Sequence, residues 1–60
     1  MKYIETTFNG IRNITVSTGA GSFESFPVDE ANPRYLAFLV QVDLTDEEVH
    51  ALPTDEWFEV

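Results

Sequence analysis

Cysteine is absent from this 60-residue chain, and histidine occurs once. A disulfide framework and a zinc site with several Cys or His ligands are therefore both excluded, although small domains often rely on one of them. A chain this short buries only about 60% of its unfolded surface when it folds. We expect a single small domain over residues 1–60, stabilised further by self-association or by docking on a larger protein.

Positive charge is also scarce. Three Lys and Arg residues stand against eleven acids, which gives a net charge of −8. A surface of this sign repels phosphate, so we expect no direct binding to nucleic acid and no attachment to anionic membranes. The acids are interpreted as a solvated surface, and the alternative is an acidic docking surface or a mimic of nucleic acid.

Long apolar runs are missing as well. No stretch approaches the roughly 18 apolar residues of a membrane-spanning helix. The start MKYIETTFNG lacks the basic segment and apolar core of a secretory signal. We therefore expect no membrane partner and no export through a signal peptide, and a chain kept in a reducing compartment.

Residues that could carry chemistry are few. His50 has no Cys or second His to join it, and we interpret it as a structural residue at or near the surface. The acidic cluster from Asp43 to Glu48 lacks the glycine and the alternation of a calcium loop. The segment TGAGSFESF has no following Lys-Ser or Lys-Thr, so it is not a phosphate cradle. We predict a protein that is not an enzyme and has no catalytic residues, cofactor, metal site or small-molecule substrate.

The N-terminal third predicts a β-hairpin. Asn9-Gly10 suits a tight type I′ turn between strands at residues 2–8 and 11–17. A two-residue turn would pair Phe8 with Ile11. We favour instead a bulge near Ile11 or Arg12, which shifts the pairing by one residue and gathers four apolar residues on the buried face: Ile4, Phe8, Ile14 and Val16. The residues left outside are then Tyr3, Glu5, Thr7, Asn13 and Thr15.

Residues 18–26 contain two glycines and several small residues, and we expect a flexible loop there. Phe23 and Phe26 would attach the far end of this loop to the core, or would contact a partner if they are exposed.

Residues 34–44 fit both a helix and a strand by periodicity. Asn32 followed by Pro33 is a good helix start, and together with the Leu and Ala content it favours a helix over 33–42. Its buried face would carry Tyr35, Phe38, Leu39 and Val42. The run from Tyr35 to Val42 is apolar on almost every side, so we expect the hairpin to cover one side and the C-terminal segment or a second protein to cover another.

Thr45 and Glu48 have the spacing of a capping box, which predicts a short helix over 46–52 that ends at Pro53. The tail DEWFEV could add a strand to the hairpin edge or remain a free docking peptide. The expected fold class is α+β: an N-terminal antiparallel β-hairpin packed on one or two short helices, with a possible short C-terminal strand.

The segment from Pro27 to Leu39 has the pattern P-x-D-x-A-N-x-x-Y-x-x-F-L. It resembles a segment of small tail-associated proteins of tailed bacteriophages, in which a short ribbon precedes the capped helix. In those proteins the helix usually runs into an A-E-G-N-like exit, whereas here it continues as Val40-Gln41-Val42-Asp43-Leu44. The resemblance implies a non-enzymatic component of the virion or its assembly, located in the virion or the host cytoplasm, that binds a larger tail or fibre protein.

Two functions follow from these expectations. In the first, a phage structural or assembly protein docks on its partner through aromatic side chains, for which we predict Tyr35, Phe38, Trp57 and Phe58. Tyr35 and Phe38 are equally suited to filling the core. In the second, the chain inhibits a host protein by mimicking nucleic acid with seven acids: Asp43, Asp46, Glu47, Glu48, Asp55, Glu56 and Glu59.

Overall fold

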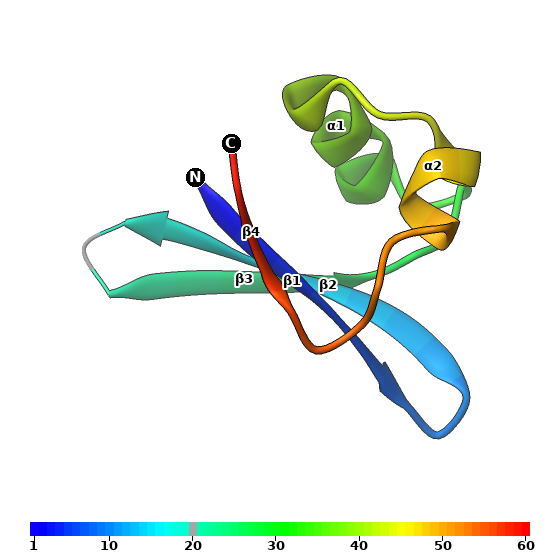
Figure 1. Ribbon diagram of the computed structural model, residues 1–60. Coiled ribbons are helices and arrows are strands. Elements are labelled where there is room, and N and C mark those ends of the chain that lie inside the picture. The colour runs from blue at the N-terminus through cyan, green and yellow to red at the C-terminus, as the bar shows by residue number, and fades with distance from the viewer. Residues whose placement is uncertain (20) are drawn as a thin grey trace.

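The computed structural model describes residues 1–19 and 21–60. It has the expected α+β class: a four-stranded antiparallel sheet with strand order β3-β2-β1-β4, and two short helices. Both helices lie on the same side of the sheet, and the two ends of the chain lie side by side (Figure 1). The elements are β1 (Lys2–Phe8), β2 (Ile11–Gly19), β3 (Ser22–Pro27), α1 (Pro33–Val42), α2 (Asp46–His50) and β4 (Trp57–Glu59).

The N-terminal hairpin is confirmed, but the bulged register is wrong. Asn9 and Gly10 have φ angles of 53° and 76°, as both central residues of a type I′ turn require. This two-residue turn pairs Phe8 with Ile11 and continues without a shift to Lys2 opposite Ser17. The turn thus fixes the pairing, and a slip of one residue would have exchanged the two faces of the ribbon.

The regular register reverses the expected faces of β1. Tyr3 and Glu5, which we expected outside, are buried with Ile14 and Val16. The two residues of β1 that we expected inside lie on the opposite face, where Phe8 is exposed and Ile4 is half-buried. Ile14 and Val16 are buried in either register, and the regular turn places Tyr3 and Glu5 beside them. The nearby Arg12 cation offsets part of the cost of burying the Glu5 carboxylate.

The expected loop at residues 18–26 is wrong over most of its length. Gly19 belongs to β2, and residues 22–27 form β3, antiparallel to β2, with an irregularity between Ser17 and Gly19. Ala20 lies outside the described residues. Phe26 is buried in the core, which was one of the two alternatives expected for these rings. Phe23 is exposed. The two rings lie three positions apart in a strand, so they project from opposite faces.

The choice between helix and strand at residues 34–44 is settled by α1. The side chain of Asn32 accepts a hydrogen bond from the backbone N–H of Arg34, and Pro33 occupies the first turn. Asp43 ends the helix in the left-handed region, with φ of 56°. Tyr35 and Phe38 are buried, and Leu39 and Val42 pack against the core, as the helical spacing predicted.

The capping box of α2 is also confirmed. The Thr45 hydroxyl accepts from the backbone N–H of Glu48, and the Glu48 carboxylate accepts from the backbone N–H of Thr45. The helix ends at His50 rather than at residue 52, with Ala51 as its C-cap. Val49 is its one buried side chain among the described residues, and it joins the core.

Aromatic rings hold the two layers together. Tyr3 on β1 meets Phe38 of α1 edge-on, with the ring centroids 5.1 Å apart, and stacks on Phe58 of β4 at 5.4 Å. Phe26 on β3 lies 5.6 Å from Phe38. The tail is thus a strand of this chain's own sheet, paired with β1.

No residue in the described part of the chain covers the outer side of α1. Leu36 is exposed, and Val40, one turn further on, is 83% exposed. The sheet supplies one of the two coverings expected for this apolar run, and the C-terminal segment supplies the other through Val49 and Leu52, which pack in the same cluster as Tyr35 and Phe38. Leu36 and Val40 stay exposed outside both coverings.

Neither helix found in residues 1–19 and 21–60 has both the length and the apolar character needed to span a membrane.

Candidate functional site

The sheet has one face that no helix covers. Side chains alternate along each strand, and the strand register shows which of them share a face. We call the face opposite the helices the open face. By this alternation it carries Lys2, Ile4, Thr6 and Phe8 of β1, Ile11, Asn13, Thr15 and Ser17 of β2, Phe23, Ser25 and Pro27 of β3, and Trp57 and Glu59 of β4.

The open face is almost free of net charge. Among its described residues only Lys2 and Glu59 carry charges, and these two form an ion pair with 3.8 Å between Nζ and Oε2. The chain as a whole carries a net charge of −8. Its unpaired negative charge is therefore concentrated on the helices, the connections and the other face of the sheet.

The two edge strands of the open face carry aromatic side chains, and the central strands between them carry Ile4 opposite Trp57 as well as small polar side chains. Trp57 on β4 is 49% exposed and Phe23 on β3 is 64% exposed. Together with Lys2 and Ser17 they line a shallow depression of about 280 Å³. Towards β3 the floor consists of hydroxyl side chains, because Thr15 pairs with Ser25 and their oxygens are 2.8 Å apart. The face is therefore a trough with aromatic walls.

The structure separates the four predicted docking residues. Tyr35 and Phe38 are fully buried, so they cannot contact a partner and the prediction for them is corrected. Phe58 is half-buried and stacks on Tyr3 on the side facing the helices. Only Trp57 of the four lies exposed on the open face. The alternation of side chains along a strand separates Trp57 from Phe58, and that alternation was visible once the tail was taken as a strand.

Three further apolar residues of this face are exposed and were not predicted as a group: Phe8, Ile11 and Phe23. Phe8 and Ile11 flank the hairpin turn, and the expected bulge placed Phe8 inside. Phe23 was considered only as part of a loop. The two-residue turn signal, taken strictly, would have placed Phe8 and Ile11 opposite each other.

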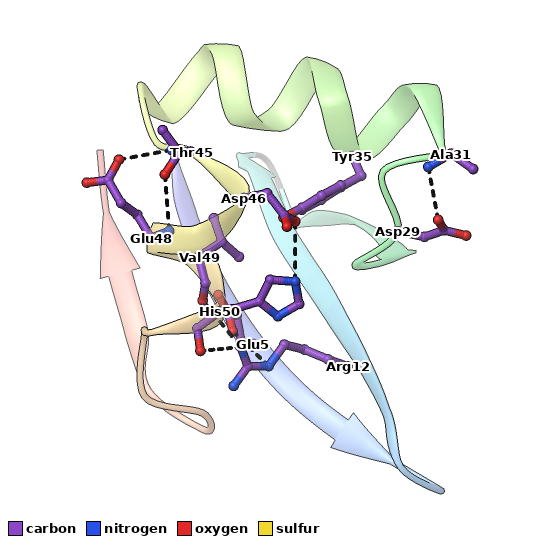
Figure 2. Close-up of polar contacts among 10 residues, drawn as sticks. All are labelled: Glu5, Arg12, Asp29, Ala31, Tyr35, Thr45, Asp46, Glu48, Val49 and His50. Carbon is purple, nitrogen blue, oxygen red and sulfur yellow. Dashed lines mark hydrogen bonds and ion pairs between the residues drawn. The ribbon is translucent and has the colours of Figure 1, made fainter.

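A polar cluster lies on the other face of the sheet, beneath α2 (Figure 2). The Glu5 side chain is fully buried, and burial raises the pKa of this carboxyl, while the charges of Arg12 and His50 oppose the rise. The Nε atom of Arg12 is 3.3 Å from Oε2 of Glu5. Arg12 Nη1 also donates to the carbonyl oxygens of Val49 and His50, so this side chain connects the sheet to the end of α2.

Three further side chains extend the cluster towards α1. The Tyr35 hydroxyl donates to Oδ1 of Asp46, and Nε2 of His50 lies 3.3 Å from the same oxygen. Burial, followed by the hydrogen bond to Asp46, raises the pKa of Tyr35, and that hydrogen bond lowers the pKa of Asp46. These contacts join α1 to α2 and hold both over the sheet.

The central carboxylate of this cluster is closed off from solvent, so it cannot reach a ligand in the folded chain. Glu5 has no exposed surface, and neither carboxylate oxygen has a hydrogen-bond partner within the described part of the chain. In the same part of the chain, no group of three or more His, Asp or Glu side chains could hold a metal ion. The contacts of the cluster run between elements of this chain, so it acts as a link between layers.

A second hollow, of about 630 Å³, lies between α1 and the adjoining ends of β1 and β2. Arg34 and Lys2 line it, but Arg34 is paired with Glu24 and Lys2 with Glu59. Arg34 also lies over the ring of Phe26, 4.9 Å from its centroid. The cations of this hollow are therefore engaged with the protein itself.

The seven acids of the mimic hypothesis do not behave as one set. Asp46, Glu48 and Glu59 have partners within the chain, namely Tyr35, the cap of α2 and Lys2. Asp43, Glu47, Asp55 and Glu56 are exposed.

These features define a class: a two-layer α+β miniature domain with helices on one face of an antiparallel sheet and, on the other, a trough whose charges, Lys2 and Glu59, are paired. Comparison with known proteins found no matching family model, no matching curated protein and no matching solved structure.

Proposed function

We propose that this chain is a non-enzymatic structural or assembly protein that acts by contact with other protein subunits. The observation that carries the proposal is the number of large apolar side chains left in water by so small a domain: Met1, Phe8, Ile11, Phe23, Leu36, Val40, Trp57 and Val60. Single exposed apolar residues are ordinary, but contiguous patches mark interaction sites.

Two surfaces of this kind are present. The first is the open face, with Trp57 and Phe23 at its walls. The second is the pair Leu36 and Val40, one turn apart on the outer side of α1, which we call the α1 stripe. The two surfaces lie on opposite sides of the molecule, because both helices cover the same face of the sheet (Figure 1). One subunit can therefore contact two protein neighbours at once.

The finer proposal is that these neighbours belong to the tail or fibre region of a bacteriophage particle. It is supported by the resemblance of residues 27–39, whose capped helix is the element that carries the α1 stripe. On this proposal the protein is found in the virion or, before assembly, in the host cytoplasm.

The test is whether the chain sediments with assembled particles. Particles made in cells that express a tagged copy are purified on a density gradient and analysed by mass spectrometry. We expect the wild-type chain in the particle fraction and its loss when Val40 is changed to Lys, because a charge replaces an apolar contact. Glu47→Lys on α2 is the matched control, since it changes charge on an exposed helix outside the stripe. A chain that stays with free protein in every case contradicts the proposal.

The second candidate is an acidic inhibitor that mimics nucleic acid. The segregation of charge favours it, because the acids lie away from the open face and Glu47, Asp55 and Glu56 are exposed. Such a complex would weaken steeply as salt is raised. Replacing these three acids by their amides should then weaken binding in steps, and unchanged affinity would exclude this function.

A further inference from the structure

We infer that the open face is the interface of a homodimer, in which the sheets of two copies pack face to face. This inference rests on the proposed function, because it names the partner that occupies one of the two surfaces. Four features of the face carry it: its charge, its shape, its area and its free edges.

Charge selects the occupant. Two copies that each carry a net charge of −8 repel one another, and they can meet only where the charge is absent or paired. The open face meets this condition, since its one cation and one anion, Lys2 and Glu59, already form a pair. A basic partner would be attracted to the acids, which lie elsewhere on the molecule. The neutral face therefore fits a second copy better than a basic protein or a nucleic acid.

Lys2 and Glu59 also suit a twofold axis. In a symmetric pair of copies each surface meets itself, so a face that carries one charge of each sign can match its own image. Two neighbouring strands hold these residues at the same level of the sheet, because Lys2 pairs with Glu59 in the β1–β4 register. The ion pair within each copy can thus be extended across the axis without introducing an unpaired charge.

Shape gives the second argument. Sheets that pack face to face interdigitate their side chains across about 10 Å. The aromatic walls formed by Trp57 and Phe23 stand on either side of a lower floor made of Ile4 and of three small side chains, Thr15, Ser17 and Ser25. The rings of one copy can therefore enter the trough of the other, where a flat or uniformly bulky face would leave gaps.

The area is that of a small, weak interface. At about 3.3 Å per residue and about 4.8 Å between strands, the four strands together cover roughly 400 Å². Two such faces bury on the order of 800 Å², below the limit of about 1,000 Å² for a stable specific interface, so we expect a dimer that dissociates readily. The dimer would place α1 and its stripe outward on both sides, free for a larger protein.

The edges of the sheet favour face-to-face packing over edge-to-edge pairing. Val28 N–H bonds to the Arg12 carbonyl, so by alternation the backbone of Pro27 points away from β2, at the free edge. Proline has no N–H to offer a further strand. At the opposite edge β4 has only three residues. Neither edge presents a long unpaired ladder, and the apolar surface lies on the face.

The experiment measures molar mass in solution by analytical ultracentrifugation from about 1 µM to about 1 mM, the range in which small interfaces dissociate. We expect a concentration-dependent shift from the 6.8 kDa monomer to twice that mass. Raising the salt should strengthen the dimer, because it screens the repulsion between two acidic copies. A wild-type chain that stays monomeric at every concentration overturns the inference, as does a dimer that salt dissociates.

Variants locate the interface. Thr15→Arg places a charge in the floor of the trough and should raise the dissociation constant about tenfold or more. Val40→Ser is the matched control, since it removes an exposed apolar side chain from α1 and should leave the dimer intact. A dimer weakened by Val40→Ser and unaffected by Thr15→Arg places the interface on α1 and overturns the inference.

A probe in the wild-type chain guards against variants that fail to fold. Trp57 is the only tryptophan, and it lies at the wall of the trough. Its quenching by acrylamide should fall as the dimer forms, and quenching that does not change while the mass doubles would overturn the inference. Failure of the proposed function is distinguishable, because a dimer that never sediments with particles refutes that function and leaves the interface standing. A monomer that does sediment with them refutes only the interface.

Discussion

The Nε atom of Arg12 lies 3.3 Å from Oε2 of Glu5, whose side chain is fully buried. The same guanidinium donates to the carbonyl oxygens of His50 and Val49, at 2.8 and 3.4 Å. A single cation therefore compensates the buried carboxylate on the central strand β1 and holds the end of α2 on the sheet. Because the layers of this small domain depend on few contacts, this pair is a sensitive point of its stability.

Replacing Arg12 by Met should lower the free energy of unfolding by about 3 kcal/mol, because it leaves Glu5 buried without its cation. Urea denaturation measures the change. Replacing both residues, Glu5 by Leu and Arg12 by Met, should recover most of the loss, since a buried pair can be exchanged for apolar side chains at little cost. Arg34→Met is the control, because its partner Glu24 is exposed and the expected cost is below about 1 kcal/mol. Equal losses of stability in Arg12→Met and Arg34→Met would contradict the view that Arg12 compensates the buried Glu5 carboxylate.

The pH dependence of stability should carry the signature of Glu5. Its pKa is raised in the folded state, so the folded chain holds this proton more tightly than the unfolded chain does. Stability from this group is therefore present below the unfolded pKa and is lost as the pH rises through the folded pKa. Glu5→Gln should remove this loss, which is seen by comparing urea midpoints of the two proteins between about pH 4 and pH 8. The same slope in both proteins would show that another group is responsible.

The Tyr35→Phe variant should raise the pKa of Asp46, because the hydrogen bond from the tyrosine hydroxyl is the main cause of its lowering. A titration followed by NMR of the carboxyl carbon gives the pKa directly. The variant should also lose about 1 kcal/mol of stability, as expected for one hydrogen bond. Tyr3→Phe tests the specificity, since Tyr3 packs in the core on Phe38 and should leave the pKa of Asp46 unchanged.

The Thr45→Ala variant should cost about 1 kcal/mol, because it removes the side chain that caps α2. Thermal or urea unfolding gives the value, and Thr54→Ala at an exposed position serves as the control. Thr45→Ser keeps the hydroxyl and should cost little. A loss for Thr45→Ala no larger than that for Thr45→Ser would show that α2 is held by Val49 and Arg12 rather than by its cap.

Local signals in the sequence located most of the elements. Asn9-Gly10 predicts the hairpin, Asn32-Pro33 predicts the start of α1, and Thr45 with Glu48 predicts the capping box. The same local signals predicted only part of the candidate surface. Trp57 was named, but it was grouped with Tyr35 and Phe38, which the fold buries. All three are aromatic residues, and the sequence does not show which rings the other layer of the fold will cover.

The sequence alone predicts the features that depend on neighbours within a few residues: the tight turn, the start of each helix and the end of α1. It also determined the net charge and the lack of cysteine. Tertiary structure decided which face of the hairpin is covered, that residues 22–27 become a strand, and that Glu5 is buried while Phe8 is not. The reason is physical: turns and caps are closed by hydrogen bonds between residues close in the chain. The face of a strand is chosen by the element that packs on it, here α1 and α2 from the other half of the molecule.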